Sequence, residues 1–229
     1  MALVILSGFP TQVFANQDNS CGCTSLERVS DGHNIEENFL NEADLETMTS
    51  IIEEKINNGY IVVNSLISLD WTDVRGVELK FEGTTTLIIV IPIVGEGYNN
   101  LSNLTLNFTD DSELLHYQEL TLSNSTENTF EVTTYINGEL TYHRITDIEF
   151  FTDGLINDNY VQVDPFSVGA VAACIAFILA VDIAIAYLIA GTCSFACSIG
   201  IVVPVVCATC ISGIVVLAGA NIMGGNIAK

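Results

Sequence analysis

The residues of this chain best suited to covalent or metal chemistry are cysteines near its C-terminus. Five of the seven cysteines lie in the last 63 residues, and four of them form the pairs Cys193 with Cys197 and Cys207 with Cys210. Spacings of four and three residues place both sulfurs of a pair on one side of a helix. If two helices fold back on each other between the pairs, Cys197 faces Cys207 and Cys193 faces Cys210. We therefore predict two disulfides here, although a sequence does not fix their connectivity.

Two other chemistries use cysteines at such spacings. Four thiolates can hold a tetrahedral zinc ion, and Cys207-Ala-Thr-Cys210 has the C-x-x-C form of thiol oxidoreductases. Neither is favoured, because the surrounding sequence is apolar. No basic residue lies nearby to favour thiolates, and nothing flanking the C-x-x-C pair supplies an acid or a base for redox chemistry. We expect no metal, no cofactor and no enzymatic activity. The partners of Cys21, Cys23 and Cys174 stay open.

The segment that carries these cysteines is almost free of charge. Between residues 167 and 229 the only acidic residue is Asp182 and the only basic one is Lys229. Its apolar runs, 168–190 and 201–220, are each near the ~20 residues that span a bilayer, so they predict either two membrane helices or a compact buried helical bundle. Asp182 is a candidate membrane-functional residue, since a charge in an apolar helix is costly and often functional. Alternatively, Asp182 is protonated or lies at a helix end.

The remaining chain is acidic and reads as a separate domain. Twenty-seven of the 28 acidic residues precede residue 167, and the net charge is −22. Apolar residues at three- and four-residue steps predict a helix over 35–56, ending at the Asn57-Asn58-Gly59 stop. From residue 60 onward, β-branched and aromatic runs separated by turns predict six to eight antiparallel strands, with a hairpin at Asn137-Gly138 and a strand end or edge at Pro92.

These patterns predict an α+β fold. We expect an N-terminal helix packed on an antiparallel β-meander, followed by an all-α, apolar, disulfide-stapled C-terminal helical hairpin. The acidic charge argues against nucleic acid as a partner. No catalytic motif appears: His33, His116 and His143 are scattered, and Asp110-Asp111 lacks the spacing of a calcium loop, so a solvated turn is the better interpretation.

The N-terminus indicates export. Residues 1–15 form an apolar run ending in Val13-Phe14-Ala15, which predicts a signal peptide cleaved between Ala15 and Asn16. No basic stretch precedes the run, so we expect the signal peptide to begin upstream of Met1. The alternative is an uncleaved strand or anchor. Secretion would place the cysteines in an oxidising compartment, where disulfides persist.

The C-terminal cysteine pattern resembles that of a known class of precursors. The stretch CSFACSIGIVVPVVCATCISGIVVLAG, residues 193–219, has paired cysteines flanking an Ile/Val/Pro core between glycines, and it is similar to the halocin C8 type of bacteriocin precursor. The resemblance implies an exported chain that a processing protease cuts. It also implies that the C-terminal peptide kills related cells and that the N-terminal portion binds the peptide as an immunity protein.

The resemblance and the composition together suggest a domain plan. Residues 16–160 would form the acidic propeptide or immunity-like domain, 161–166 the linker and 167–229 the antimicrobial peptide, with processing at Pro165, Phe166 and Ser167. The partners would be a target cell membrane, the chain's own N-terminal domain as inhibitor, and the protease. Two alternatives remain: a membrane-anchored surface protein with a two-helix C-terminal transmembrane hairpin, and a membrane thiol oxidoreductase that uses Cys207 and Cys210.

Overall fold

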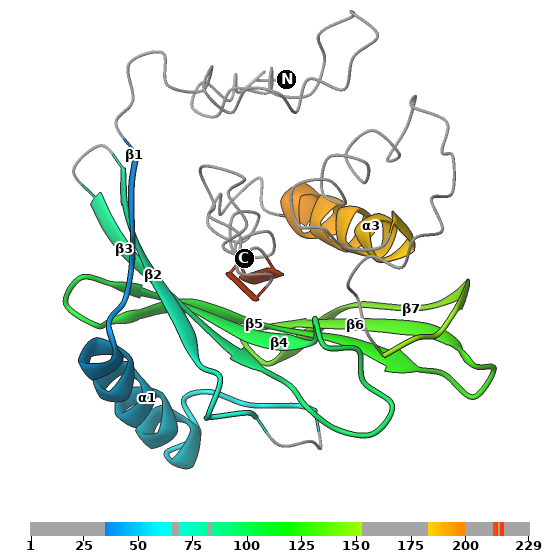
Figure 1. Ribbon diagram of the computed structural model, residues 1–229, viewed down its shortest axis with the longest axis horizontal. Coiled ribbons are helices and arrows are strands. Elements are labelled where there is room, and N and C mark those ends of the chain that lie inside the picture. The colour runs from blue at the N-terminus through cyan, green and yellow to red at the C-terminus, as the bar shows by residue number, and fades with distance from the viewer. Residues whose placement is uncertain are drawn as a thin grey trace, which may run out of the picture.

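The described residues form one antiparallel sheet of seven strands that lie side by side in the order of the sequence, together with the helices that pack on it. The structure is a computed structural model, and it describes residues 35–65, 69–81, 84–152, 183–199, 213–214 and 216–217. Helix α1 (Glu42–Asn57) lies on one face of the sheet, and helix α3 (Ile183–Ile199) lies on the other (Figure 1). The strands are β1 (Ile35–Phe39), β2 (Arg75–Phe81), β3 (Thr84–Pro92), β4 (Asn103–Thr109), β5 (Leu114–Asn124), β6 (Thr129–Ile136) and β7 (Glu139–Glu149).

The predicted fold class is wrong. The described part of the chain is predominantly β, and it contains no C-terminal helical hairpin. Helix α3 and the helical residues 213–214 and 216–217 pack against the sheet. The length and hydropathy of an apolar run show that it must be buried, but they do not show whether its partner is a second helix or a sheet. Here the partner of the described apolar residues is the sheet.

The N-terminal helix begins later than predicted. Residues 35–39 form edge strand β1, paired with β2, and α1 starts only after Asn41, whose side chain accepts a hydrogen bond of 3.0 Å from the backbone N–H of Asp44. Such an N-cap satisfies a donor that the first turn leaves unpaired. The predicted stop is confirmed, because α1 ends at Asn57, with Asn58 as its C-cap and Gly59 at φ +75°.

The predicted hairpin at Asn137-Gly138 is confirmed. Both residues have positive φ, 51° and 83°, and join β6 to β7, as a tight turn between twisted strands requires. Pro92 is the last residue of β3, as expected. The hairpin's second strand, β7, runs unbroken from Glu139 to Glu149.

Residues 60–65 do not form the predicted strand. They run across the sheet and are held by two side chains of β5. The Tyr117 hydroxyl accepts a hydrogen bond of 3.0 Å from the Val62 N–H, and the buried Glu119 carboxylate accepts bonds of 2.7 and 2.5 Å from the N–H groups of Asn64 and Ser65. These two residues supply the hydrogen bonds that a neighbouring strand would otherwise provide.

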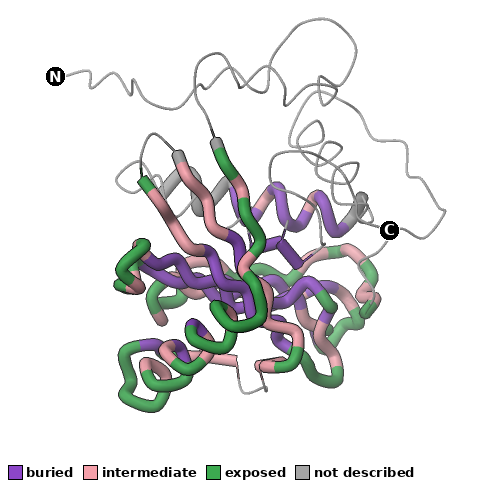
Figure 2. The backbone as a smooth tube through the Cα atoms, turned by 60° about the vertical axis from the view of Figure 1, so that its left-hand side comes forward, coloured by how far each residue is buried: buried purple, intermediate pink, exposed green. Residues whose placement is uncertain are grey.

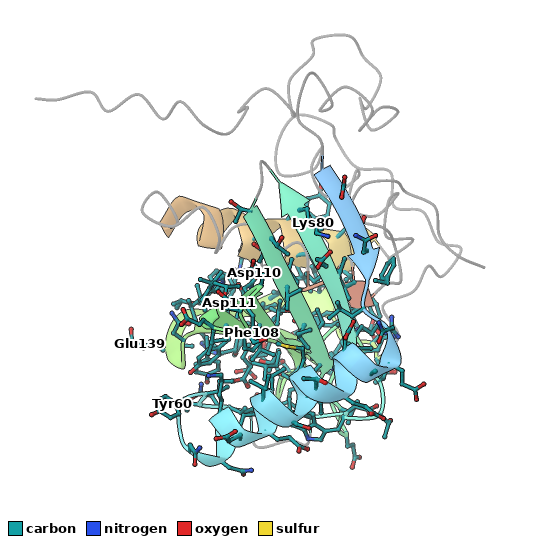
Figure 3. All side chains as sticks on the ribbon, turned by 90° about the vertical axis from the view of Figure 1, so that its left-hand side faces the viewer. Tyr60, Lys80, Phe108, Asp110, Asp111 and Glu139 are labelled. Atoms are coloured by element: carbon teal, nitrogen blue, oxygen red, sulfur yellow. The ribbon has the colours of Figure 1, made fainter. Side chains whose placement is uncertain are left out.

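Both faces of the sheet are buried at its centre. The outer face packs against α1 through residues such as Leu104, Leu106 and Phe108, while the inner face contacts α3 and residues 213–217. In Figure 2, buried backbone runs through the central strands and along α3, whereas most of α1 is exposed or intermediate. Figure 3, seen from the α1 side, places Phe108 in the interior and Tyr60 and Glu139 at the periphery.

Candidate functional site: the inner face of the sheet

The larger apolar patch of the inner face lies under α3. Strands β5 and β6 supply it, and the buried side chains of α3 complete a single cluster with them. Each fully buried Leu, Ile or Phe contributes roughly 1.5–3 kcal/mol relative to exposure in water. The strand residues are Leu120, Leu122, Phe130 and Val132, and those of α3 are Ile185, Ala186, Leu188, Ile189, Ala190 and Cys193.

A second apolar patch lies under residues 213–217. Val77 of β2 and Ile88 and Val90 of β3 pack against Val216 and Leu217, which are 1% and 8% exposed. Ile214, one turn earlier, belongs to the cluster under α3. The inner face therefore buries two separate stretches of the apolar C-terminal segment, one on each half of the sheet (Figure 1).

Arg75 fixes the end of the 213–217 stretch. Its Nε and Nη2 donate to the Asp73 carboxylate at 3.0 and 2.8 Å, which orients the guanidinium. The remaining Nη1 donates to the backbone carbonyls of Val216 and Leu217. A charged donor makes a stronger hydrogen bond to a backbone carbonyl than a neutral donor does. This is a direct polar contact between the acidic domain and the C-terminal segment.

A buried polar strip separates the two patches. It consists of Asn103, Thr105 and Asn107 of β4 with His116 and Gln118 of β5, all 5% exposed or less. Register pairs Thr105 with Gln118 and Asn107 with His116. Among the described atoms, Gln118 Oε1 and the neighbouring Thr134 Oγ1 have no hydrogen-bond partner. Because a permanent core avoids such groups, the strip is typical of a surface that also meets water.

His116 is neutral at neutral pH. Burial lowers the pKa of its imidazole from 6.5 to about 4, because a charged imidazolium is poorly solvated inside the protein. The inner face therefore carries no positive charge at its centre unless the surroundings become acidic.

Comparison with family models, with curated proteins and with solved structures finds no match for this chain. The site must therefore be interpreted from its own geometry.

One predicted disulfide cysteine lies in the described part of the inner-face cluster. Cys193 is 3% exposed, packs in the cluster under α3 and is disulfide-bonded. Its partner is not among the residues whose side chains are described, so the pairing with Cys210 stays a prediction. The backbone of Cys197 belongs to α3, but its side chain, together with Cys207 and Cys210, lies outside the described part.

The other predicted site residues also fall outside the described residues. They are the signal cleavage site at Ala15 and Asn16, the processing site at Pro165, Phe166 and Ser167, the candidate membrane residue Asp182, and Cys21, Cys23 and Cys174. Within the described part, no helix is long and apolar enough to cross a membrane, and no group of three potential metal ligands is found.

The predicted acidic turn and one of the scattered histidines lie away from the inner face. Asp110 and Asp111 are exposed between β4 and β5 (Figure 3). His143 contacts the Glu131 carboxylate at 2.7 Å across the β6–β7 pair.

The sequence analysis missed the polar strip and Arg75. The β4 sequence NLTLNFT alternates polar and apolar residues, which ordinarily indicates a strand with one wet face. In the structure six of its seven residues are buried. The one available signal was the reduced number of charged residues: β4 has none, although the domain around it is strongly acidic.

Proposed function

We propose that this chain is the precursor of a secreted, bacteriocin-like antimicrobial peptide. The acidic domain, residues 16–160, holds the apolar C-terminal segment, residues 167–229, against the inner face of its sheet. Proteolysis near Pro165, Phe166 and Ser167 releases that segment, which then acts on the membrane of a target cell. The protein has no enzymatic role in this scheme.

The observation that supports this proposal is the position of the C-terminal segment. Helix α3 and residues 213–217 bury their apolar side chains against strands that belong to the acidic domain. A segment with such composition would otherwise expose a large apolar surface, which favours aggregation or membrane binding. The inner face covers that surface and keeps it from water.

The polar strip and the charge of the domain also support the proposal. After release, the inner face would be exposed, and Asn103, Thr105, Asn107, His116 and Gln118 give it groups that water can solvate. The net charge of −22 keeps the empty domain soluble and repels anionic lipid. The domain could therefore remain folded near a membrane that attracts the peptide.

Cleavage of the full chain tests the proposal. A specific protease site is inserted between Phe166 and Ser167, and dye leakage is measured from vesicles of phosphatidylethanolamine and phosphatidylglycerol. We expect the uncut chain to cause no leakage and the cut chain to cause leakage. Size-exclusion chromatography before vesicles are added should show the cut segment still eluting with the acidic domain.

Two leucines of β5 provide a matched pair of variants. Leu122 is fully buried under α3, whereas Leu115 is 49% exposed. Leu122→Ala should weaken retention of the cut segment and speed leakage at least tenfold, because Leu-to-Ala changes in a core cost about 2–5 kcal/mol. Leu115→Ala should change neither. Equal leakage from uncut and cut chains, or no leakage from the cut Leu122→Ala variant, would contradict the proposal.

A further inference from the structure

Gly213 of the C-terminal segment lies directly against strand β4. A Cβ atom placed on Gly213 would overlap the hydroxyl oxygen of Thr105 and would lie 3.1 Å from both Asn103 Oδ1 and Thr105 Cβ. Contacts this short are rare for real side chains, so an alanine at 213 requires either the segment or the strand to move. Glycine is the residue that fits this position.

The two side chains below Gly213 are held in place. Thr105 Oγ1 donates to Asn103 Oδ1 at 2.7 Å, and Asn103 Nδ2 donates to the Leu101 carbonyl at 2.8 Å. Both residues are buried, at 1% and 3% exposure, on a strand that is paired on both sides. Moving either side chain would break a buried hydrogen bond, which is costly. The surface below Gly213 is therefore rigid.

We propose that Asn103 and Thr105 select the segment that docks on the inner face by requiring glycine at position 213. This inference rests on the proposed function and names the feature of the peptide that the acidic domain recognises. The recognised element includes Gly213, Val216 and Leu217. Gly213 lies on the polar strip, Val216 and Leu217 fill the apolar patch of β2 and β3, and Arg75 donates to the backbone carbonyls of Val216 and Leu217.

A second glycine of the C-terminal segment provides the control. Gly191 lies in α3, and a Cβ atom placed on it would have no neighbour within 4 Å. Alanine is a better helix former than glycine. In the absence of a clash, alanine should therefore make either helical stretch slightly more stable, so an opposite effect at Gly213 reports the contact with the sheet.

Amide hydrogen exchange of the uncut chain measures the docking directly. In the wild type, the amides of residues 214–217 should be protected. Gly213→Ala should speed their exchange at least tenfold and leave α1 unchanged, whereas Gly191→Ala should leave them unchanged or slower. Thr105→Ala removes the hydroxyl that the new methyl would strike, so the double variant with Gly213→Ala should recover most of the protection.

The outcomes separate this inference from the proposed function. Unprotected amides at 214–217 in the wild type would show that the inner face does not hold the segment, and both proposals would fall. Protection that Gly213→Ala leaves intact would overturn the selection of glycine alone. The selection of glycine would also be overturned if the double variant were no better protected than Gly213→Ala. For this comparison, Thr105→Ala by itself should keep the wild-type protection within about threefold.

Discussion

Acidification should weaken the fold through His116, at the centre of the inner face. The pKa of His116 is lowered from 6.5 to about 4 by burial. The unfolded chain therefore binds a proton to this residue at a higher pH than the folded chain does. Between about pH 6.5 and pH 4 the unfolded state gains protons first, so the free energy of unfolding must fall as the pH falls. Above about pH 6.5 this contribution is constant.

The expected size follows from the shift. A difference of about 2.5 pKa units at about 1.36 kcal/mol per unit corresponds to roughly 3 kcal/mol, all of which is lost once the pH is below about 4. His116 is only 5% exposed, so solvent screening reduces this figure little. For a domain of ordinary stability, roughly 5–15 kcal/mol, the loss is substantial.

Guanidinium unfolding of the wild type and of His116→Gln, at several values between about pH 7 and pH 4, measures the effect. The many carboxylates titrate in both proteins, so the difference between their unfolding free energies isolates His116. We expect the wild type to lose about 3 kcal/mol more than His116→Gln over this range. His143→Gln is the control, because His143 is half-exposed beside Glu131. Parallel pH profiles for the wild type and His116→Gln would refute the reasoning.

Three further changes test other parts of the fold. Phe130→Ala removes a fully buried ring whose centroid lies 5.0 Å from those of the Phe150 and Phe151 rings. It should lower the free energy of guanidinium unfolding by about 3–5 kcal/mol. A loss below about 1 kcal/mol would contradict the packing under α3. Glu119→Gln replaces an acceptor of the Asn64 and Ser65 N–H groups; it should cost about 1–3 kcal/mol and speed hydrogen exchange at 60–65, and unchanged exchange there would contradict the described contact. Gly138→Ala puts a side chain at φ +83° and should lower the free energy of unfolding by about 1–2 kcal/mol, whereas an unchanged melting temperature would count against the turn geometry.

Features that depend on neighbouring residues could be predicted from the sequence. The Asn137-Gly138 turn and the stop of α1 at Gly59 are both fixed by residues that tolerate positive φ. The strand end at Pro92 follows from the missing N–H of proline. Each of these signals acts within a few residues of its own position.

Features that depend on distant residues could not be predicted from the sequence. Ile35–Phe39 has the composition of a helix start, and only its pairing with β2 makes it a strand. The same holds for the inner face. Asn103 and Thr105 read as solvent-facing residues until a segment more than 100 positions later covers them. The helical hairpin was predicted for the same reason, since the sequence of the apolar segment does not identify its partner.

The strand order of the sheet has a consequence for synthesis. Every strand pairs only with the strands before and after it in the chain, so strand pairing between residue 35 and residue 149 needs no residue of the C-terminal segment. Domains generally fold as units from the N-terminus as the chain is made. The sheet can thus be complete before residue 183 has been synthesised. The most aggregation-prone part of the protein would then emerge next to a finished surface that already fits it.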